Sequence, residues 1–176
     1  MTTFNIPTRE EVSPASQVAF DNLTKALGMV PNLYAAIAYS ENGLPKYLAY
    51  QGGRTSLSNK EKEAVNLIVS QVNGCKYCLS AHTVLGKMNG FTEEEVIRLR
   101  KGSSSDPKLD ALVALAKDVT ENKGHVSQNN LDKFFAAGYT KGSLVDVILQ
   151  VSDKVAMNYL HNLTNIAIDF PLAPDL

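Results

Sequence analysis

The chain has 176 residues, of which 44% are hydrophobic and 20% charged, and its formal net charge is −1. This length and composition are typical of one globular domain with a sizeable apolar core. Lys and Arg are scattered, which disfavours nucleic acid as a partner, and no apolar run approaches the roughly 18 residues of a membrane span. The N-terminal stretch MTTFNIPTREE has charge and proline where a signal peptide is apolar, so we expect a cytoplasmic protein.

The first helices are bounded by clear capping signals. After an N-terminal arm of residues 1–12, Ser13 is an N-cap type and Pro14 is favoured at the first helical position. Gly28 is expected to end this helix in a left-handed conformation. Two shorter helices should follow, over about residues 32–41 and 44–53.

The middle of the chain, residues 58–102, is predicted to form the core helices. Ser58 with Glu61 is a capping box that opens a helix ending at Asn73–Gly74. A second helix follows directly, and Thr92 with Glu95 is another capping box ahead of VIRLRKG.

The last third predicts three more helices. The first starts at Asp106–Pro107 and ends near Gly124, and the second is closed by Gly138. Thr140 should cap a long apolar segment that persists to about Asp169 and stops at Pro171. Its run LVDVILQV could be a strand by composition, but the apolar spacing continues in helical phase through Leu163, which favours a helix. We therefore predict an all-α fold of roughly seven or eight helices, in a single domain over residues 1–176.

The stretch NGCKYCLSAHT holds both cysteines of the chain and one of its three histidines. Since Asn73–Gly74 ends one helix, Cys75 should lie in the first turn of the next. Helical phase then places Cys75, Cys78 and His82 in one narrow stripe. A thiol in a first turn is near unsatisfied N–H groups, which lower its pKa, and an imidazole one turn away can relay its proton.

Several interpretations of this stripe stay open from the residues alone. The cysteines could be a redox pair, part of a metal site, a structural disulfide or two inert thiols. So short a disulfide loop would contribute only roughly 2 kcal/mol. A structural zinc site takes four ligands. With no further cysteine in the chain, such a site would need Glu63, His161 or another subunit.

Glu63 is the most interesting carboxylate of the preceding helix. On a helical wheel it lies just outside one edge of the buried apolar arc, beside Leu67. Periodicity alone therefore predicts that Glu63 is a solvated boundary residue.

The spacing of Glu63, Cys75, Cys78 and His82, with a glycine at position 90, closely resembles the AhpD-like alkylhydroperoxidase group of the carboxymuconolactone decarboxylase superfamily. The flanking stretches LGMVPNL, LSNKEKEAVNLIVSQVNGC and NYLHNLTNIAIDFP resemble its peroxidase-related branch, so the resemblance covers most of the chain. It implies an AhpD-like multihelical fold.

The resemblance also implies a role for each site residue. Cys78 would attack a hydroperoxide and become a sulfenic acid, and Cys75 would condense with it to a disulfide that a thiol partner reduces. Glu63 and His82 would form the proton relay that generates the thiolate. No cofactor or metal is implied, because both electrons come from the thiols.

The chain departs from the founding hydroperoxidases between the cysteines, where they carry a histidine and this chain has Lys76–Tyr77. On an exposed turn the charge of Lys76 would be screened, and we interpret Tyr77 as a packing or rim residue. His161, on the last helix, is interpreted as a structural histidine.

The resulting hypothesis is an antioxidant peroxidase that reduces organic hydroperoxides, because we expect the thiols in a largely apolar pocket. Its partners would be a hydroperoxide substrate and a thiol or dithiol reductant. The resemblance implies a homo-oligomer, which could be a dimer, trimer or hexamer. Two alternatives remain, a disulfide reductase or redox relay without peroxidase activity, and a redox-sensing or metal-binding module.

Overall fold

The computed structural model describes residues 4–176, and over that range it contains nine α-helices, one short 3-10 helix and no strand. The predicted all-α fold is therefore confirmed. This is more than the roughly seven or eight helices predicted, and α2, predicted over about residues 32–41, is only six residues long. Of the predicted N-terminal arm, residues 1–3 lie outside the described residues, and η1 (Arg9–Glu11) is a 3-10 helix within the rest. The described residues group into two compact units.

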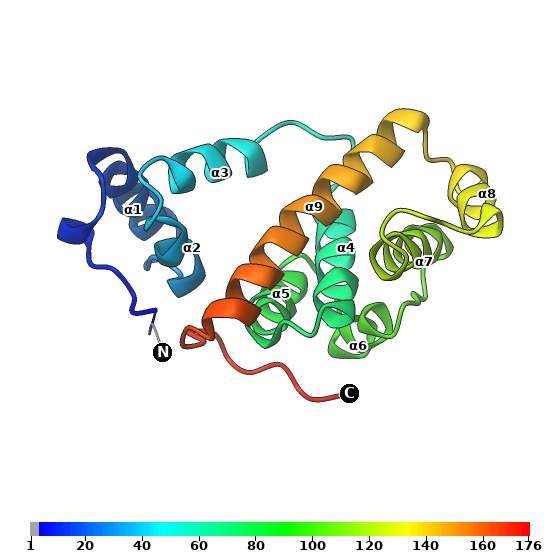
Figure 1. Cartoon of the computed structure of the whole chain (residues 1–176). Helices are drawn as coiled ribbons and strands as arrows, with labels where there is room; N and C mark the ends of the chain where they lie inside the picture. The colour runs from blue at the N-terminus through cyan, green and yellow to red at the C-terminus, as the bar shows by residue number, and fades with distance from the viewer. Residues whose placement is uncertain (1–3) are drawn as a thin grey trace. The chain divides into compact units, whose positions relative to one another are not determined.

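One unit comprises residues 4–54 together with Leu160–Asp169. It contains α1 (Pro14–Leu27), α2 (Asn32–Ile37) and α3 (Gly43–Gln51), seen in blue to cyan in Figure 1. The predicted caps of α1 are confirmed, since the Ser13 side chain accepts a hydrogen bond from the Ser16 N–H and Gly28 has a φ of 79°. One cluster of its buried apolar residues consists of Val12, Ala19, Phe20, Ala35, Ala38 and Leu44.

Two predicted helix ends in this unit are wrong. The second helix ends at Ile37 rather than near residue 41, and α9 ends at Thr164 rather than near Asp169. Asn165, directly after α9, has a φ of 49°, a left-handed conformation that asparagine tolerates. The segment that follows α9 is not helical and places the Asp169 carboxylate at the start of α2, where it accepts a hydrogen bond from the Asn32 N–H at 2.7 Å. Capping of another helix therefore favours the non-helical conformation of this segment.

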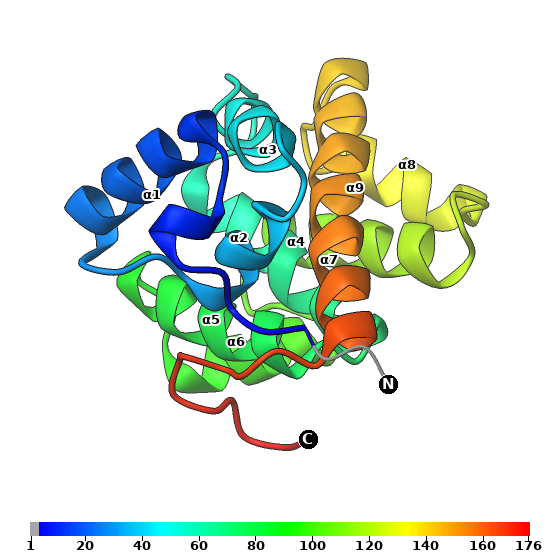
Figure 2. The same cartoon turned by 60° about the vertical axis from the view of Figure 1, so that its left-hand side comes forward.

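The other unit comprises Thr55–Tyr159 and Phe170–Leu176. Its helices are α4 (Asn59–Val72), α5 (Lys76–Met88), α6 (Glu93–Arg100), α7 (Pro107–Glu121), α8 (Gln128–Ala136) and α9 (Lys141–Thr164), the last belonging to this unit up to Tyr159. Helix α4 is central and contacts α5, α6 and α7. Figures 1 and 2 show that α9 runs alongside α4.

The predicted caps of this unit are confirmed with one correction. Ser58 and Glu61 form the reciprocal capping box at the start of α4. The Thr92 side chain caps α6 by accepting a hydrogen bond from the Glu95 N–H, but the Glu95 carboxylate does not accept one from the Thr92 N–H. It accepts instead from the backbone and hydroxyl of Ser105, at 3.0 and 2.8 Å. Glu95 therefore ties α6 to the loop that follows it.

Helices α4, α6, α7 and α9 bury most of the apolar core of this unit. Its largest fully buried side chains are Leu67, Ile68, Leu99, Leu112, Leu115 and Phe134. Within residues 4–176, no helix has both the length and the apolarity that crossing a membrane requires.

Candidate active site

The redox motif lies at the sharp connection between α4 and α5. Helix α4 ends at Val72, and Gly74 has a φ of 64°, which glycine adopts without strain. Cys75 is the N-cap of α5, and its sulfur accepts a hydrogen bond from the Cys78 N–H at 3.2 Å. This is the bond that a Ser or Asp oxygen usually accepts. Cys75 was predicted in the first turn, but the structure places it one residue earlier, at the cap, with Cys78 in the turn.

The two thiols are free and buried, and the Cys78 N–H donates to the Cys75 sulfur. The hydrogen bond from Cys75 lowers the pKa of Cys78. Burial opposes this effect, whereas the charge of Lys154 and a hydrogen bond from Asn158 add to it. The same bond between the thiols, together with burial, raises the pKa of Cys75. Cys78 is therefore the cysteine that loses its proton first, and Cys75 remains as a donor beside it.

Glu63 on α4 and His82 on α5 form a buried pair. The Glu63 Oε2 and His82 Nδ1 atoms are 2.7 Å apart. Because an ionised carboxylate only accepts hydrogen bonds, Nδ1 must carry a proton, which leaves Nε2 of a neutral ring as the basic atom. Burial lowers the pKa of His82, the Lys154 charge lowers it further, and Glu63 opposes both. The ring is therefore held neutral and is available as a base.

Asn66 and Gln150 support this pair. The Asn66 amide donates to Glu63 Oε1 at 3.3 Å, and its oxygen accepts from Gln150 Nε2 at 2.8 Å. Burial alone would raise the pKa of Glu63, but His82, Lys154 and Asn66 hold it below its usual range. Glu63 is therefore a carboxylate fixed by hydrogen bonds at both oxygens.

Helix α9 contributes a line of polar residues to the buried polar layer that contains Glu63, His82 and the two thiols. Gln150, Lys154 and Asn158 are four positions apart, so they share one face of the helix. Asn158 donates to Ser70 Oγ at 3.2 Å and accepts from the Asn73 amide at 3.0 Å. Lys154 and Asn158 on this face of α9 both lower the pKa of Cys78.

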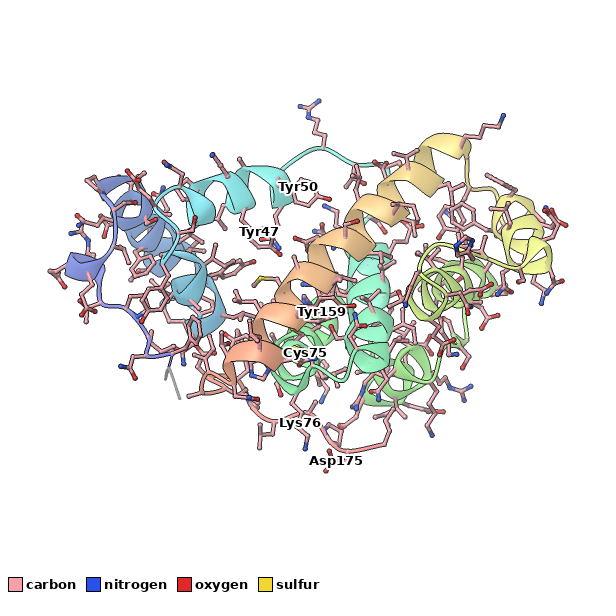
Figure 3. All side chains as sticks on the ribbon, viewed as in Figure 1. Tyr47, Tyr50, Cys75, Lys76, Tyr159 and Asp175 are labelled. Atoms are coloured by element: carbon pink, nitrogen blue, oxygen red, sulfur yellow. The ribbon has the colours of Figure 1, made fainter. Side chains whose placement is uncertain are left out.

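The residues between the cysteines contact the C-terminal segment. Tyr77 is buried and packs edge-to-face on Phe170, with ring centroids 5.7 Å apart, as its prediction as a packing residue requires. Lys76 is exposed, and its ammonium lies 3.3 Å from the Asp175 carboxylate. Figure 3 shows these two side chains next to each other, where the segment passes the start of α5. Lys76 and Tyr77, where the chain departs from the founding hydroperoxidases, therefore contact the C-terminal segment.

A family model described as the carboxymuconolactone decarboxylase family matches residues 33–122, slightly more than half of the chain. The chain belongs to this family. The matched range contains all four predicted site residues, whereas Lys154 and Asn158 lie beyond it. A similar sequence is uncharacterized protein YdfG of Bacillus subtilis strain 168, which is 24% identical over 102 residues, or 56% of this chain and 69% of that protein.

Several solved structures are similar to this carboxymuconolactone decarboxylase family member. An uncharacterized peroxidase-related protein from Ralstonia eutropha JMP134, described as an alkylhydroperoxidase AhpD core, matches with a TM-score of 0.85 at 16% identity, over 94% of this chain and 91% of its own. A peroxidase-related protein from Silicibacter sp. TM1040 has a TM-score of 0.82 at 21% identity, with the same coverage. A cysteine-to-alanine variant of the debrominase Bmp8, in complex with 2,3,4-tribromopyrrole, has a TM-score of 0.78 at 15% identity, over 96% and 93%. These likenesses establish the AhpD-like fold.

The structure places the four residues that the sequence singled out in two contacting pairs. Cys75 contacts Cys78, and Glu63 contacts His82. The prediction that Glu63 is a solvated boundary residue is wrong, since only 9% of it is exposed. Glu63 lies beside the apolar arc of α4, and that part of α4 is covered because polar residues of α5 and α9 pack against it. Among residues 4–176, no group of three or more His, Cys, Asp or Glu side chains is arranged to hold a metal ion.

The sequence analysis missed the polar residues that α9 adds, Gln150, Lys154 and Asn158. A signal was present, because these polar residues recur every fourth position along the predicted last helix. His161, in the other unit, is buried, and its Nε2 lies 3.2 Å from the Ile166 carbonyl oxygen. That backbone contact supports its interpretation as a structural histidine.

Proposed function

We propose that this protein reduces organic hydroperoxides with electrons from the Cys75–Cys78 dithiol, which an external thiol or dithiol then restores. The observation that carries the proposal is a buried, hydrogen-bonded dithiol on the same polar layer as the Glu63–His82 pair. A thiolate is the competent nucleophile, and an unperturbed cysteine, with a pKa near about 8.5, is mostly protonated at neutral pH. The arrangement supplies both a lowered thiol pKa and a base.

In the first step, the Cys78 thiolate attacks the distal oxygen of the hydroperoxide ROOH. The S–O bond forms as the O–O bond breaks, and two electrons pass from sulfur to the leaving alkoxide. His82 Nε2, which takes the thiol proton, returns it so that the alkoxide leaves as ROH, while Glu63 stabilises the transient imidazolium. Cys78 becomes a sulfenic acid.

In the second step, the sulfur of Cys75 attacks the Cys78 sulfenic acid. The S–S bond forms, the S–O bond breaks, and hydroxide leaves as water with the proton of Cys75. The sum is ROOH plus two thiols giving ROH, water and a disulfide. Both electrons come from the cysteines, so no bound cofactor is needed, and a reducing compartment such as the cytoplasm would supply the thiol.

The partners in this proposal are a hydroperoxide, a thiol reductant and further copies of the same chain. Val145, Ile148 and Leu149 are exposed apolar residues on α9, which supports a homo-oligomer of two, three or six chains. Light scattering after gel filtration should give a mass that is a multiple of the 19.1 kDa chain.

The test is hydroperoxide consumption with dithiothreitol by wild type, Cys78→Ser and Cys75→Ser. We expect Cys78→Ser to fall to the background rate, because it lacks the nucleophile. In the absence of dithiothreitol, Cys75→Ser should complete one turnover and then keep a sulfenic acid on Cys78, which dimedone labelling and mass spectrometry would detect. If Cys78→Ser consumes cumene hydroperoxide as fast as wild type, the assignment of Cys78 is wrong.

A second candidate is reductive debromination, which the similarity to the debrominase Bmp8 favours. The same thiolate could attack the bromine of an aryl bromide, so that an S–Br bond forms, the C–Br bond breaks and the carbon takes a proton. Attack by Cys75 would then release bromide and leave the disulfide. Bromide release from 2,3,4-tribromopyrrole, measured beside hydroperoxide consumption with the same variants, separates the two reactions.

A further inference from the structure

Lys154 lies at the centre of the polar face of α9. One turn before it, Gln150 donates to Asn66 on α4, and one turn after it, Asn158 donates to Ser70 on α4. Asn66 and Ser70 are four positions apart on α4, whereas Gln150 and Asn158 are eight positions apart on α9, so the two helices run in the same direction here without an equal spacing of contacts. Lys154 is therefore held between these two contacts, facing the layer that contains Glu63, His82 and the thiols.

The Lys154 side chain is almost completely buried, with 5% of its area exposed. Burying an ammonium group is costly unless anionic groups and hydrogen-bond acceptors replace its water. Its closest carboxylate oxygen, on Asp153, is 3.7 Å away, which is longer than a hydrogen bond. The adjacent Asp153 therefore compensates the buried charge only in part.

The remaining titratable groups near Lys154 come from the two helices packed against α9. Helix α4 contributes Glu63, and α5 contributes Cys75, Cys78 and His82. Glu63 is already occupied by His82 and Asn66, whose hydrogen bonds satisfy both of its oxygens. Because the His82 ring is neutral, the Glu63 carboxylate and the Cys78 sulfur are the two groups in this layer whose negative charge Lys154 favours.

We propose that Lys154 is a positioning residue of the redox pair, whose buried ammonium holds the Cys78 sulfur as the thiolate and so makes Cys78, not Cys75, the nucleophile. Asn158, on the next turn of α9, also lowers the pKa of both thiols. This inference deepens the proposed function, and its consequence for turnover rests on it. The preference for ionising Cys78 can be measured without any hydroperoxide.

The experiment compares Lys154→Met and Lys154→Gln with Lys154→Arg, which keeps the charge, and with Lys141→Met. Lys141 is an exposed lysine at the start of the same helix and serves as the matched control. Reduced protein is treated with iodoacetamide from pH 5 to 10, the labelling of each cysteine is followed by mass spectrometry, and thiolate absorbance near 240 nm is recorded. Far-ultraviolet circular dichroism checks that each variant folds.

We expect both neutral variants to label Cys78 at least about tenfold more slowly at neutral pH, with the midpoint of its titration moved up by about one pH unit or more. Lys154→Arg should restore most of the rate, and Lys141→Met should match wild type. If Lys154 only supported the fold, folded neutral variants would keep the wild-type labelling profile, and the proposal would be overturned.

If neither neutral variant folds, the wild-type protein alone can still test the proposal. Cys78 must then react faster than Cys75 at neutral pH, and equal or reversed rates would overturn the proposal. Failure of the proposed function is distinguishable, because a wild type that consumes no hydroperoxide could still show a thiolate on Cys78 that depends on Lys154.

Discussion

Helix α4 carries two buried carboxylates, two positions apart, in different surroundings. On the side of α7 and the loop before α9, Glu61 accepts hydrogen bonds from the Ser58 and Tyr139 hydroxyls, both at 2.7 Å. The Lys108 ammonium lies 3.3 Å from it. On the side of α5 and α9, Glu63 pairs with His82 instead.

The two sites show that burial and ionisation do not identify a functional carboxylate. Burial tends to raise the pKa of each, yet hydrogen bonds and nearby positive charge hold both below their usual range. The donors to Glu61 keep their protons at neutral pH, and burial raises the pKa of Tyr139 further. Glu63 faces an imidazole, which can gain and lose a proton near neutral pH. The chemistry of the partner therefore separates a structural site from a candidate catalytic one.

The largest contrast should come from neutralising each carboxylate in turn. We expect Glu63→Gln to lower kcat/KM for cumene hydroperoxide by about 100-fold, since general-base assistance contributes at least that much. Glu61→Gln should stay within about twofold of wild type, because its site does not face the thiols. Equal losses of kcat/KM in two folded variants would remove the distinction between these sites.

A second contrast is in stability. Tyr139→Phe removes the hydroxyl that donates to Glu61 and should lower the free energy of unfolding by about 1–3 kcal/mol, because a buried carboxylate loses a hydrogen bond. Urea unfolding measures this loss, and hydroperoxide turnover should be unchanged. Tyr159→Phe is the matched control, since Tyr159 is exposed and should tolerate the change. Equal unfolding midpoints for the two variants would contradict a stabilising role for Tyr139.

A third expectation concerns acid. Because burial lowers the pKa of His82 below its ordinary 6.5, the unfolded chain binds this proton more readily than the folded one. The free energy of unfolding should therefore decrease as the pH falls below about 6.5, and Glu63 should add a further loss below about 4.5 because its folded pKa is also lowered. Urea midpoints between pH 7.5 and 5.5 should fall less steeply in His82→Asn. The same slope in both proteins would show that His82 is not held neutral.

The smallest effect is expected at an exposed ion pair. Lys76→Ala and Asp175→Ala should leave thermal unfolding unchanged within error and turnover within about twofold, because both side chains are mostly solvent-exposed and their attraction is screened. A large loss of turnover in Lys76→Ala would mean that the residue between the cysteines acts on the thiols directly.

The starts of the helices could be predicted from short stretches of sequence. Ser13, Ser58, Thr92, Asp106 and Ser127 all cap helices in the structure. Each cap involves a side chain and a backbone N–H two or three positions later, so no distant residue is needed to form it. The stripe of Cys75, Cys78 and His82 was predictable for the same reason, because it depends on the geometry of a single helix.

Contacts between distant segments account for what could not be predicted this way. The early ends of α2 and α9 accompany the bond from Asn32 to Asp169, which are 137 positions apart. Glu63 is at the edge of the apolar arc on its own helix, and only packing by other helices buries it. Lys154 is on the face of α9 that lies along α4 through bonds such as Gln150 to Asn66, 84 positions apart. A capping or periodicity rule covers a few neighbouring residues, whereas the surroundings of a buried charge depend on every helix that excludes water from it.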